Sequence, residues 1–218
     1  MKIALEYTKT FGGRVISFCQ DEFLAKKGVL NESIVSTELG LKGIPNISES
    51  INIYRDIEIL RYSGGKIHIP YVTTSKGVDL IREAKKNNLD ITASVSLAHI
   101  TFSEKDIPEF DTNYKLIPPL RSESDLNSLK EGLVDGTLDY LTSMHEPFDV
   151  DNKKIVFDNA SSGSIGLESM FGLMSNQFTL EKTIDILTRK KIIFEVDDHP
   201  IEIGSLADLS LFNPDKNY

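Results

Sequence analysis

The chain has 218 residues, 40% of them hydrophobic and 26% charged, which supports a sizeable core and argues against a disordered protein. Its formal net charge of −9 disfavours general nucleic-acid binding, because phosphate contacts need clustered Lys and Arg side chains. The single Cys19 excludes an internal disulfide, and the charged N-terminus and the lack of a long apolar stretch predict a cytoplasmic protein with no signal peptide or membrane span.

The first half of the chain begins with two helical patterns. Ile3, Tyr7 and Phe11 recur four apart, which predicts one face of a helix that Gly12-Gly13 ends, and a strand follows at 14–18. After a loop-rich stretch, Asn46 and Glu49 form a capping-box pattern that opens a second helix. The apolar residues assigned to this helix are Ile47, Ile51, Tyr54 and Ile57.

Three more strands alternate with helices as far as residue 142. Strands are predicted at 66–72, 90–95 and 138–142. Ser75 is predicted to cap the helix after the first of these strands, and Ser122 and Asp125 to cap another that runs to Gly132. Strand-then-helix units of this kind predict a parallel α/β sheet, as either a doubly wound sheet or a barrel.

The pattern changes after residue 150. Two helical stretches, at 166–174 and 179–188, precede three short strand-like runs. The runs are Ile192–Val196, Ile201–Ile203 and Leu209–Phe212. This tail is predicted to begin a small β domain.

The segment from Asp111 to Phe148, DTNYKLIPPLRSESDLNSLKEGLVDGTLDYLTSMHEPF, is the most distinctive part of the chain. It resembles the dihydroorotase pattern D-T-N-x-K-x-x-P-P-L-R, a helix, D-G-T-I-D and then T-D-H-A-P-H. The resemblance extends back through HIPYVTTSKGVDLIREAKKNNLDITASV and forward to EIGSLADLSLFNPD. It covers essentially the whole chain, but only the later half of the family's proteins.

The resemblance implies a specific architecture. Residues 1–190 would form strands five to eight of an amidohydrolase-type (β/α)8 barrel, and residues 191–218 the start of a small β-sandwich segment. The family opens and closes the dihydroorotate ring with the help of metal ions. The first half of the barrel, which supplies an H-x-H metal pair and substrate-binding residues in the family, has no counterpart in this sequence.

The resemblance also places the family's functional positions on residues of different chemistry. Phe18 and Tyr71 occupy metal-ligand positions, Met144 occupies the general-base position, and Phe148 stands where a histidine helps to hold the substrate carboxylate. Phe offers no lone pair, a Met thioether is a weak donor, and a neutral Tyr phenol is a poor ligand. We therefore expect no bound cofactor and no catalytic residue; zinc would be expected only if the chain proved active.

Other candidate site residues have simpler alternatives. Asn113 and Pro147 are candidate substrate-binding residues, and His68 and His145 are possible residual metal ligands, although a structural role at a strand end is favoured for His145. The remaining candidates are His99 as a hydrogen-bonded loop histidine, His199 in an exposed turn, Cys19 as a buried inert thiol, and Ser161–Gly166 as an anion cradle or a plain glycine turn.

Three functions remain open on the sequence. The favoured one is a non-catalytic dihydroorotase-like protein, serving assembly in the way that inactive family members scaffold aspartate carbamoyltransferase. The second is a cyclic amide hydrolase that is active only with a complementary barrel half, and the third is a decayed gene fragment. Because four strands cut from a barrel have two free edges, the expected partner is a second copy or a complementary half.

Overall fold

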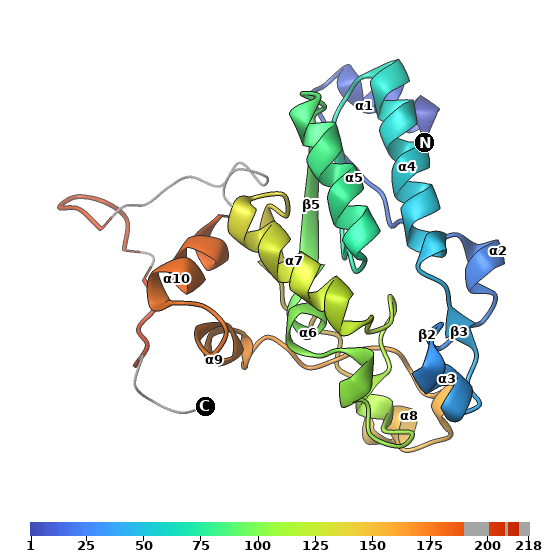
Figure 1. Cartoon of the computed structure of the whole chain (residues 1–218). Coiled ribbons are helices and arrows are strands. Elements are labelled where there is room, and N and C mark those ends of the chain that lie inside the picture. Colours follow the sequence, from blue (N-terminus) through green and yellow to red (C-terminus); the bar gives the residue numbers. More distant parts are fainter. Residues whose placement is uncertain (190–200, 208, 214–218) are drawn as a thin grey trace.

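A four-stranded parallel sheet organises the computed structural model, which describes residues 1–189, 201–207 and 209–213 (Figure 1). Its strands lie in the order β1-β4-β5-β6, and Ile16 pairs with His68, His68 with Thr92, and Ser94 with Tyr140. The strands are β1 (Val15–Ile16), β4 (Ile67–Ile69), β5 (Ile91–Ser96) and β6 (Tyr140–Thr142). The prediction of four parallel strands is confirmed, although three of the four are shorter than the patterns suggest.

One layer of helices packs against this sheet. The helices are α1 (Lys2–Lys9), α4 (Ile47–Ser63), α5 (Ser75–Lys86) and α7 (Glu123–Asp135), and α4, α5 and α7 stand side by side (Figure 1). Because side chains alternate along a strand, one sheet face carries Ile67, Ile69, Ile91, Ala93 and Val95 toward these helices. These strand residues are buried in one core with Ile53, Ile57, Val78, Ile81, Leu129 and Leu133.

The apolar stripes predicted for α1 and α4 do not face the core. Ile3, Tyr7 and Phe11 are 80%, 69% and 65% exposed, and the residue that α1 buries is Leu5. On α4, Ile57 is buried as expected, but Ile47, Ile51 and Tyr54 are exposed, and the helix buries Ser48, Glu49, Asn52, Ile53, Asp56, Ile57 and Leu60. Periodicity identifies these helices but does not show which side packs inward.

The helix starts agree with the sequence in part. Ser122 Oγ accepts the backbone N–H of Asp125, as predicted, and Gly136, rather than Gly132, ends α7 in the left-handed conformation. Thr74 caps α5 instead of Ser75. The capping box at Asn46 and Glu49 is wrong, because both side chains bond to distant partners instead of to the first turn of α4.

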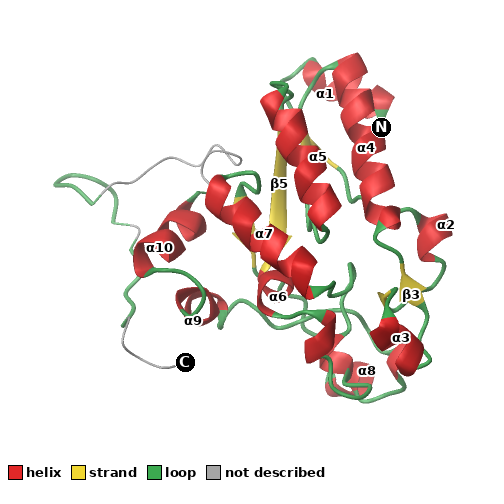
Figure 2. Ribbon diagram, viewed as in Figure 1, coloured by secondary structure: helices red, strands yellow, loops and turns green. Residues whose placement is uncertain are grey.

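Short elements fill the loops at the carboxyl ends of the strands (Figure 2). A two-stranded parallel sheet, β2 (Leu30–Asn31) with β3 (Gly43–Ile44), lies in the stretch that the sequence presents only as loop-rich. The short helices are α2 (Glu22–Ala25), α3 (Ile34–Glu38), α6 (Leu97–Thr101), α8 (Val150–Lys153), and 3-10 turns at Glu104–Asp106, Thr112–Tyr114 and Phe157–Asn159.

Two helices follow residue 165: α9 (Met170–Ser175) and α10 (Leu180–Thr188), which Thr179 caps. Beyond them the strands predicted at Ile201–Ile203 and Leu209–Phe212 are wrong. Residues 201–205 form bends and a turn, and 209–212 have no regular structure. Ile203 and Leu211 are fully exposed, and no strand among the described residues pairs with either run. The run at 192–196 lies outside the described residues, and a β-sandwich segment at 191–218 stays a prediction.

No described helix combines the length and apolar character that a bilayer span requires.

Candidate functional site

The carboxyl ends of the four strands form the mouth of the sheet, where parallel α/β folds place their functional groups. Phe18, Tyr71 and Met144 each lie two residues beyond a strand, after β1, β4 and β6 respectively. The Phe18 side chain is partly exposed, and Met144 is buried. The three positions that the resemblance assigns to catalysis therefore lie at the ends of three parallel strands.

The backbone is strained at two of these positions. Tyr71 has φ 54° and Met144 has φ 47°, in the left-handed region that non-glycine residues seldom adopt. Such a conformation costs on the order of 1 kcal/mol and is concentrated at functional sites, where the surrounding structure holds it. Tyr71 and Met144 therefore share a left-handed backbone at two strand ends, on side chains that are poor or weak metal donors.

The side chains at the mouth do not fit a zinc ion. Within the described part of the chain, no three His, Cys, Asp or Glu side chains lie close enough to share a metal. Phe18 has no donor atom, and Tyr71 and Met144 offer only a phenol and a thioether. No chemical step through a metal follows from these residues.

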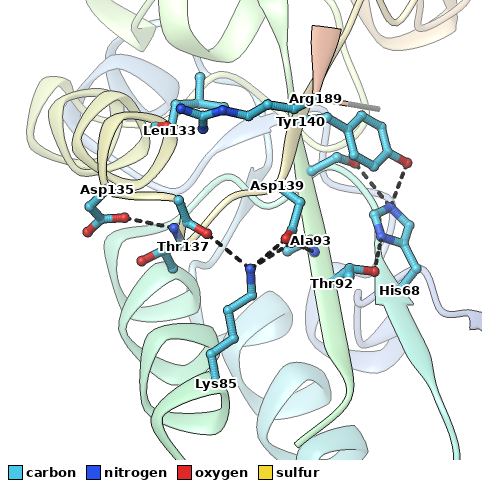
Figure 3. A network of polar contacts seen from close by, with 12 residues as sticks. His68, Lys85, Thr92, Ala93, Leu133, Asp135, Thr137, Asp139, Tyr140 and Arg189 are labelled. Atoms are coloured by element: carbon cyan, nitrogen blue, oxygen red, sulfur yellow. Dashed lines mark hydrogen bonds and ion pairs between the residues drawn. The ribbon is translucent and has the colours of Figure 1, made fainter. Parts of the chain in front are cut away.

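His68 is committed to a hydrogen-bond network inside the sheet (Figure 3). It lies in β4, where Nδ1 is 2.9 Å from Thr92 Oγ1 and Nε2 is 2.9 Å from the Tyr140 hydroxyl and 3.2 Å from Ser94 Oγ. The imidazole also stacks on the Tyr140 ring, with centroids 5.2 Å apart and planes 13° apart. Both ring nitrogens have partners, and this arrangement does not favour the possible role of His68 as a residual metal ligand.

Burial explains the electrostatics of His68. Loss of solvation, helped by the positive charges of Arg14 and Lys85, lowers its pKa to about 4, so the ring is neutral at pH 7. Burial also raises the pKa of the Tyr140 phenol. Beside this pair, the Lys85 ammonium lies 2.8 Å from both carboxylate oxygens of Asp139, and Asp139 in turn accepts the Ala93 N–H at 2.7 Å (Figure 3).

His145 lies at a strand end, as predicted, and its side chain is exposed. Its backbone forms a parallel bridge with Ser164, and its Nδ1 accepts the Leu167 N–H at 3.4 Å. The neighbouring Glu146 N–H donates to the Ser164 carbonyl at 2.8 Å. These contacts agree with the structural role that the sequence favours for His145.

A cavity of about 360 Å³ lies between α6 and the loops that follow β5 and β6 along the chain. Asn113, Pro147 and Phe148 line it together, so the structure brings the two candidate substrate-binding residues to one place. Its other walls are mostly apolar, from Ala98, Phe102, Tyr114, Leu116, Leu120 and Ile165, with Glu146, Lys153, Gly163 and Ser164 as the polar or small residues. The size is at the low end for small-molecule pockets.

Phe148 is held in this wall by a close glycine. A Cβ built on Gly163 would lie 2.7 Å from the Phe148 ring and 2.5 Å from the Glu146 carbonyl, so no larger residue fits. The Gly163 N–H donates to the Lys115 carbonyl, and the Ser161 N–H to that of Asn152. The Ser161–Gly166 segment therefore uses its glycine for packing, and the anion cradle is not supported.

Two lysines fix the loops around the cavity. The Lys115 ammonium donates to the carbonyls of Phe157 and Asp158 at 2.8 and 2.9 Å. The Lys153 ammonium donates to the carbonyls of Gly163 and Thr112 at 2.8 and 3.0 Å. Burial lowers the pKa of both lysines. Loop composition alone does not reveal this arrangement, because all four acceptors are backbone carbonyls.

A buried polar network behind the mouth was also missed by sequence reasoning. Glu49 accepts the backbone N–H groups of Thr73 and Thr74 and both of their hydroxyls. Arg121 donates to Thr73 Oγ1, to Asn31 Oδ1 and to the Ile44 carbonyl. The network joins α4, the turn after β4 and the β2-β3 sheet. The signals in the sequence are a charged residue, Glu49, on an otherwise inward-facing side of a helix and the position of Arg121 at the end of the matched motif.

The other candidates have structural roles. Cys19 is buried, and burial beside Asp56 raises its thiol pKa, in agreement with an inert thiol. His99 is buried in α6 rather than in a loop; it bonds to Ser96 Oγ at 2.6 Å and to the Pro118 carbonyl at 3.0 Å, and burial lowers its pKa to about 4. His199 lies outside the described residues.

Comparison with known proteins identifies the relatives of this chain, although no protein-family model matches it. Dihydroorotase from Caldanaerobacter subterraneus is 37% identical over 227 residues, which cover 100% of this chain and 52% of the relative. Dihydroorotase from Listeria innocua is 36% identical over 93% of this chain and 49% of the relative. The chain thus spans about half the length of the curated relatives it matches.

Solved structures give the same coverage at lower identity. L-Hydantoinase from Arthrobacter aurescens superposes with a TM-score of 0.80 and 19% identity, over 94% of this chain and 49% of that chain. Dihydroorotase from Saccharomyces cerevisiae, in complex with 5-fluoroorotic acid, superposes with a TM-score of 0.69 and 13% identity, over 89% and 53%. At these identities the likeness concerns the fold.

The parallel sheet, its outer helices and the loops at its mouth therefore define a fragment of an amidohydrolase-type α/β barrel. Within that class the chain is a partial dihydroorotase-like protein, as the motif at 111–148 indicates.

Proposed function

We propose that this chain is a non-catalytic dihydroorotase-like protein of pyrimidine biosynthesis, formed by the later half of the barrel, with residues 191–218 leading into a β-sandwich segment. The observation that carries the proposal is the chemistry of the strand ends. By the resemblance, Phe18, Tyr71 and Met144 lie where the family's reaction needs metal ligands and a base. Phe has no donor atom, a neutral Tyr phenol is a poor metal ligand, and a Met thioether is not a base. The nearest histidine along β4, His68, is neutral and hydrogen-bonded at both nitrogens.

The role that we propose is assembly in the cytoplasm. An inactive barrel half can support a neighbouring enzyme through its surface, and aspartate carbamoyltransferase is the candidate that the resemblance implies. Retention of ordered loops and a formed cavity at the mouth supports a folded product over a decayed gene fragment.

A second function is a cyclic amide hydrolase that works only with a complementary half. One observation favours it: Asn113 and Pro147, the candidate substrate-binding residues, line the same cavity. In that case the complementary half would have to supply the metal ligands.

Metal content and turnover test the proposal. The chain would be produced with zinc in the medium and assayed with dihydroorotate, alone and with the half of the Caldanaerobacter dihydroorotase that lies outside the matched residues. We expect far less than one zinc per chain and no turnover. The intact Caldanaerobacter protein, prepared in the same way, serves as the positive control. Stoichiometric zinc with turnover in either sample would overturn the proposal.

A double variant sharpens this test. Phe18→His with Tyr71→His places two imidazoles at the ends of neighbouring strands, so we expect it to retain more zinc than the unchanged chain. Phe23→His, on an exposed residue of α2, is the matched control and should retain no more than the unchanged chain.

A further inference from the structure

The cavity between α6 and the loops after β5 and β6 has an apolar floor and a polar rim. Leu116 and Leu120 are buried in its lining, and Phe102 of α6 is half-buried beside them. Asn113 and Glu146, which line the same cavity, are exposed to solvent. A ligand that fills this space therefore places its apolar part against the two leucines and its polar group at the rim.

Three aromatic rings border the cavity, those of Phe102, Tyr114 and Phe148. Phe102 and Tyr114 pack edge to face, with centroids 5.4 Å apart and planes 74° apart. Rings attract one another in edge-to-face and offset-stacked geometries, so this lining favours an aromatic ring over an aliphatic chain. A volume of about 360 Å³ suits a single ring with a short side chain.

The walls of the cavity are held by contacts within the protein. His99 of α6 lies 3.0 Å from the Pro118 carbonyl, which joins the helix to the loop that carries Tyr114 and the two leucines. On the other side, the close approach of Gly163 holds the Phe148 ring in place. A site that is already formed does not spend binding free energy on ordering its loops.

The charged groups of the lining differ in what they offer a ligand. Lys153 uses two of its three ammonium N–H donors on the carbonyls of Gly163 and Thr112. The Glu146 carboxylate has no hydrogen bond or ion pair within the described part of the chain. It acts on Lys153 only through its charge, and burial is the main cause that lowers the Lys153 pKa. The charge left for a ligand is therefore negative.

We propose that this cavity binds a small aromatic amine, with the ring against Leu116 and Leu120 and the ammonium at the Glu146 carboxylate. The Asn113 amide oxygen offers a second acceptor at the rim, and an ammonium close to aromatic rings gains from cation–π attraction. A carboxylate ligand would meet the charge of Glu146 and would find no hydrogen-bond donor on the Phe148 ring. The inference rests on the proposed loss of catalysis, because a working site would reserve this region for an acid substrate.

A set of matched probes tests the ligand class. The probes are 2-phenylethylamine, 2-phenylethanol and phenylacetate, which share a ring and differ in charge, together with dihydroorotate. Each would be titrated into the full chain at pH 7 and followed by ligand-observed NMR. We expect the amine to bind about fivefold more tightly than the alcohol, the size of an exposed ion pair, and both to bind more tightly than the two acids.

Two variants separate the contribution of the charge from that of the apolar floor. Glu146→Gln keeps the shape of the rim and should make the amine bind no better than the alcohol, while binding of the alcohol stays unchanged. Ala98→Leu places a larger side chain in the lining and should abolish binding of both. Glu131→Gln, on an exposed glutamate of α7, is the matched control and should behave like the unchanged chain. Circular dichroism would verify that each variant keeps its fold.

The contrary outcomes are equally specific. Phenylacetate or dihydroorotate binding as tightly as the amine would overturn the proposal, as would an advantage of the amine that persists in Glu146→Gln. Absence of binding by the amine to the unchanged chain would also overturn it. These results are distinct from the test of catalytic inactivity: preferential binding of dihydroorotate without zinc or turnover would remove the aromatic amine and leave the non-catalytic function standing.

Discussion

His68 takes its hydrogen bonds from two other strands of the sheet. The alternation of β4 points its side chain to the sheet face opposite the helices, where Thr92, Ser94 and Tyr140 complete its hydrogen bonds. A single sequence reveals the residue type, but the partners come from two other strands and appear only after the sheet is formed.

The two buried histidines should make stability depend on pH. His68 and His99 have an ordinary pKa of 6.5 and a folded pKa of about 4, so below pH 6.5 the unfolded chain binds protons that the folded chain refuses. The contribution of these two neutral histidines to the free energy of unfolding is complete above about pH 6.5, and it is lost as the pH falls toward 4. The loss approaches roughly 3 kcal/mol for each histidine.

Urea unfolding between pH 7.5 and pH 4 would measure this slope. His68→Gln should unfold with a shallower pH dependence than the unchanged chain, because one of the two groups is gone. His145→Gln, which removes an exposed histidine, should leave the slope unchanged. Equal slopes for all three proteins would contradict the assignment.

At the scale of elements, Glu49 connects α4 to the turn that follows β4. Its carboxylate takes two backbone N–H groups and two hydroxyls, and it is buried near Arg121. We expect Glu49→Ala to lower the free energy of unfolding by about 3 kcal/mol, because it leaves those donors and the Arg121 charge buried without the carboxylate.

A matched substitution lies on the same helix. Glu58 forms an exposed ion pair with Arg61, and Glu58→Ala should change the free energy of unfolding by less than about 1 kcal/mol. Urea denaturation at pH 7 compares the two variants. Similar losses in the free energy of unfolding for Glu49→Ala and Glu58→Ala would show that the buried network around Glu49 does not stabilise the mouth.

The elements were more predictable than their orientation. Four strands and their crossover helices follow from apolar runs and caps, since these signals are local. Tertiary geometry decided the rest: Ile3, Tyr7 and Phe11 share a helical face, but the core lies on the Leu5 side. The two-residue strands β2 and β3 are too short to show any alternation. At the mouth, motif comparison found Asn113, Lys115, Pro147 and Phe148. It did not find Lys153, nor the backbone carbonyls to which Lys115 and Lys153 donate.

For the whole molecule, the sheet has a protected middle and two edge strands, β1 and β6, of which β1 exposes its side chain. β4 and β5 have a neighbour on each side and bury Ile67, Ile69, Ala93 and Val95, whereas β1 has a neighbour on one side and exposes Ile16. Local opening should therefore be rare at the centre and frequent at the β1 end, because few buried contacts hold that end closed.

Hydrogen exchange followed by mass spectrometry would measure this gradient on the chain alone. We expect amides of 67–69 and 91–96 to exchange slowest and the Ile16 amide to exchange much faster, since its N–H points to the open edge. Adding the complementary half should slow exchange at 15–18 and in α1 while leaving β5 as it was. If the Ile16 amide were already as protected as β5 in the chain alone, another copy would have to be covering the edge in solution.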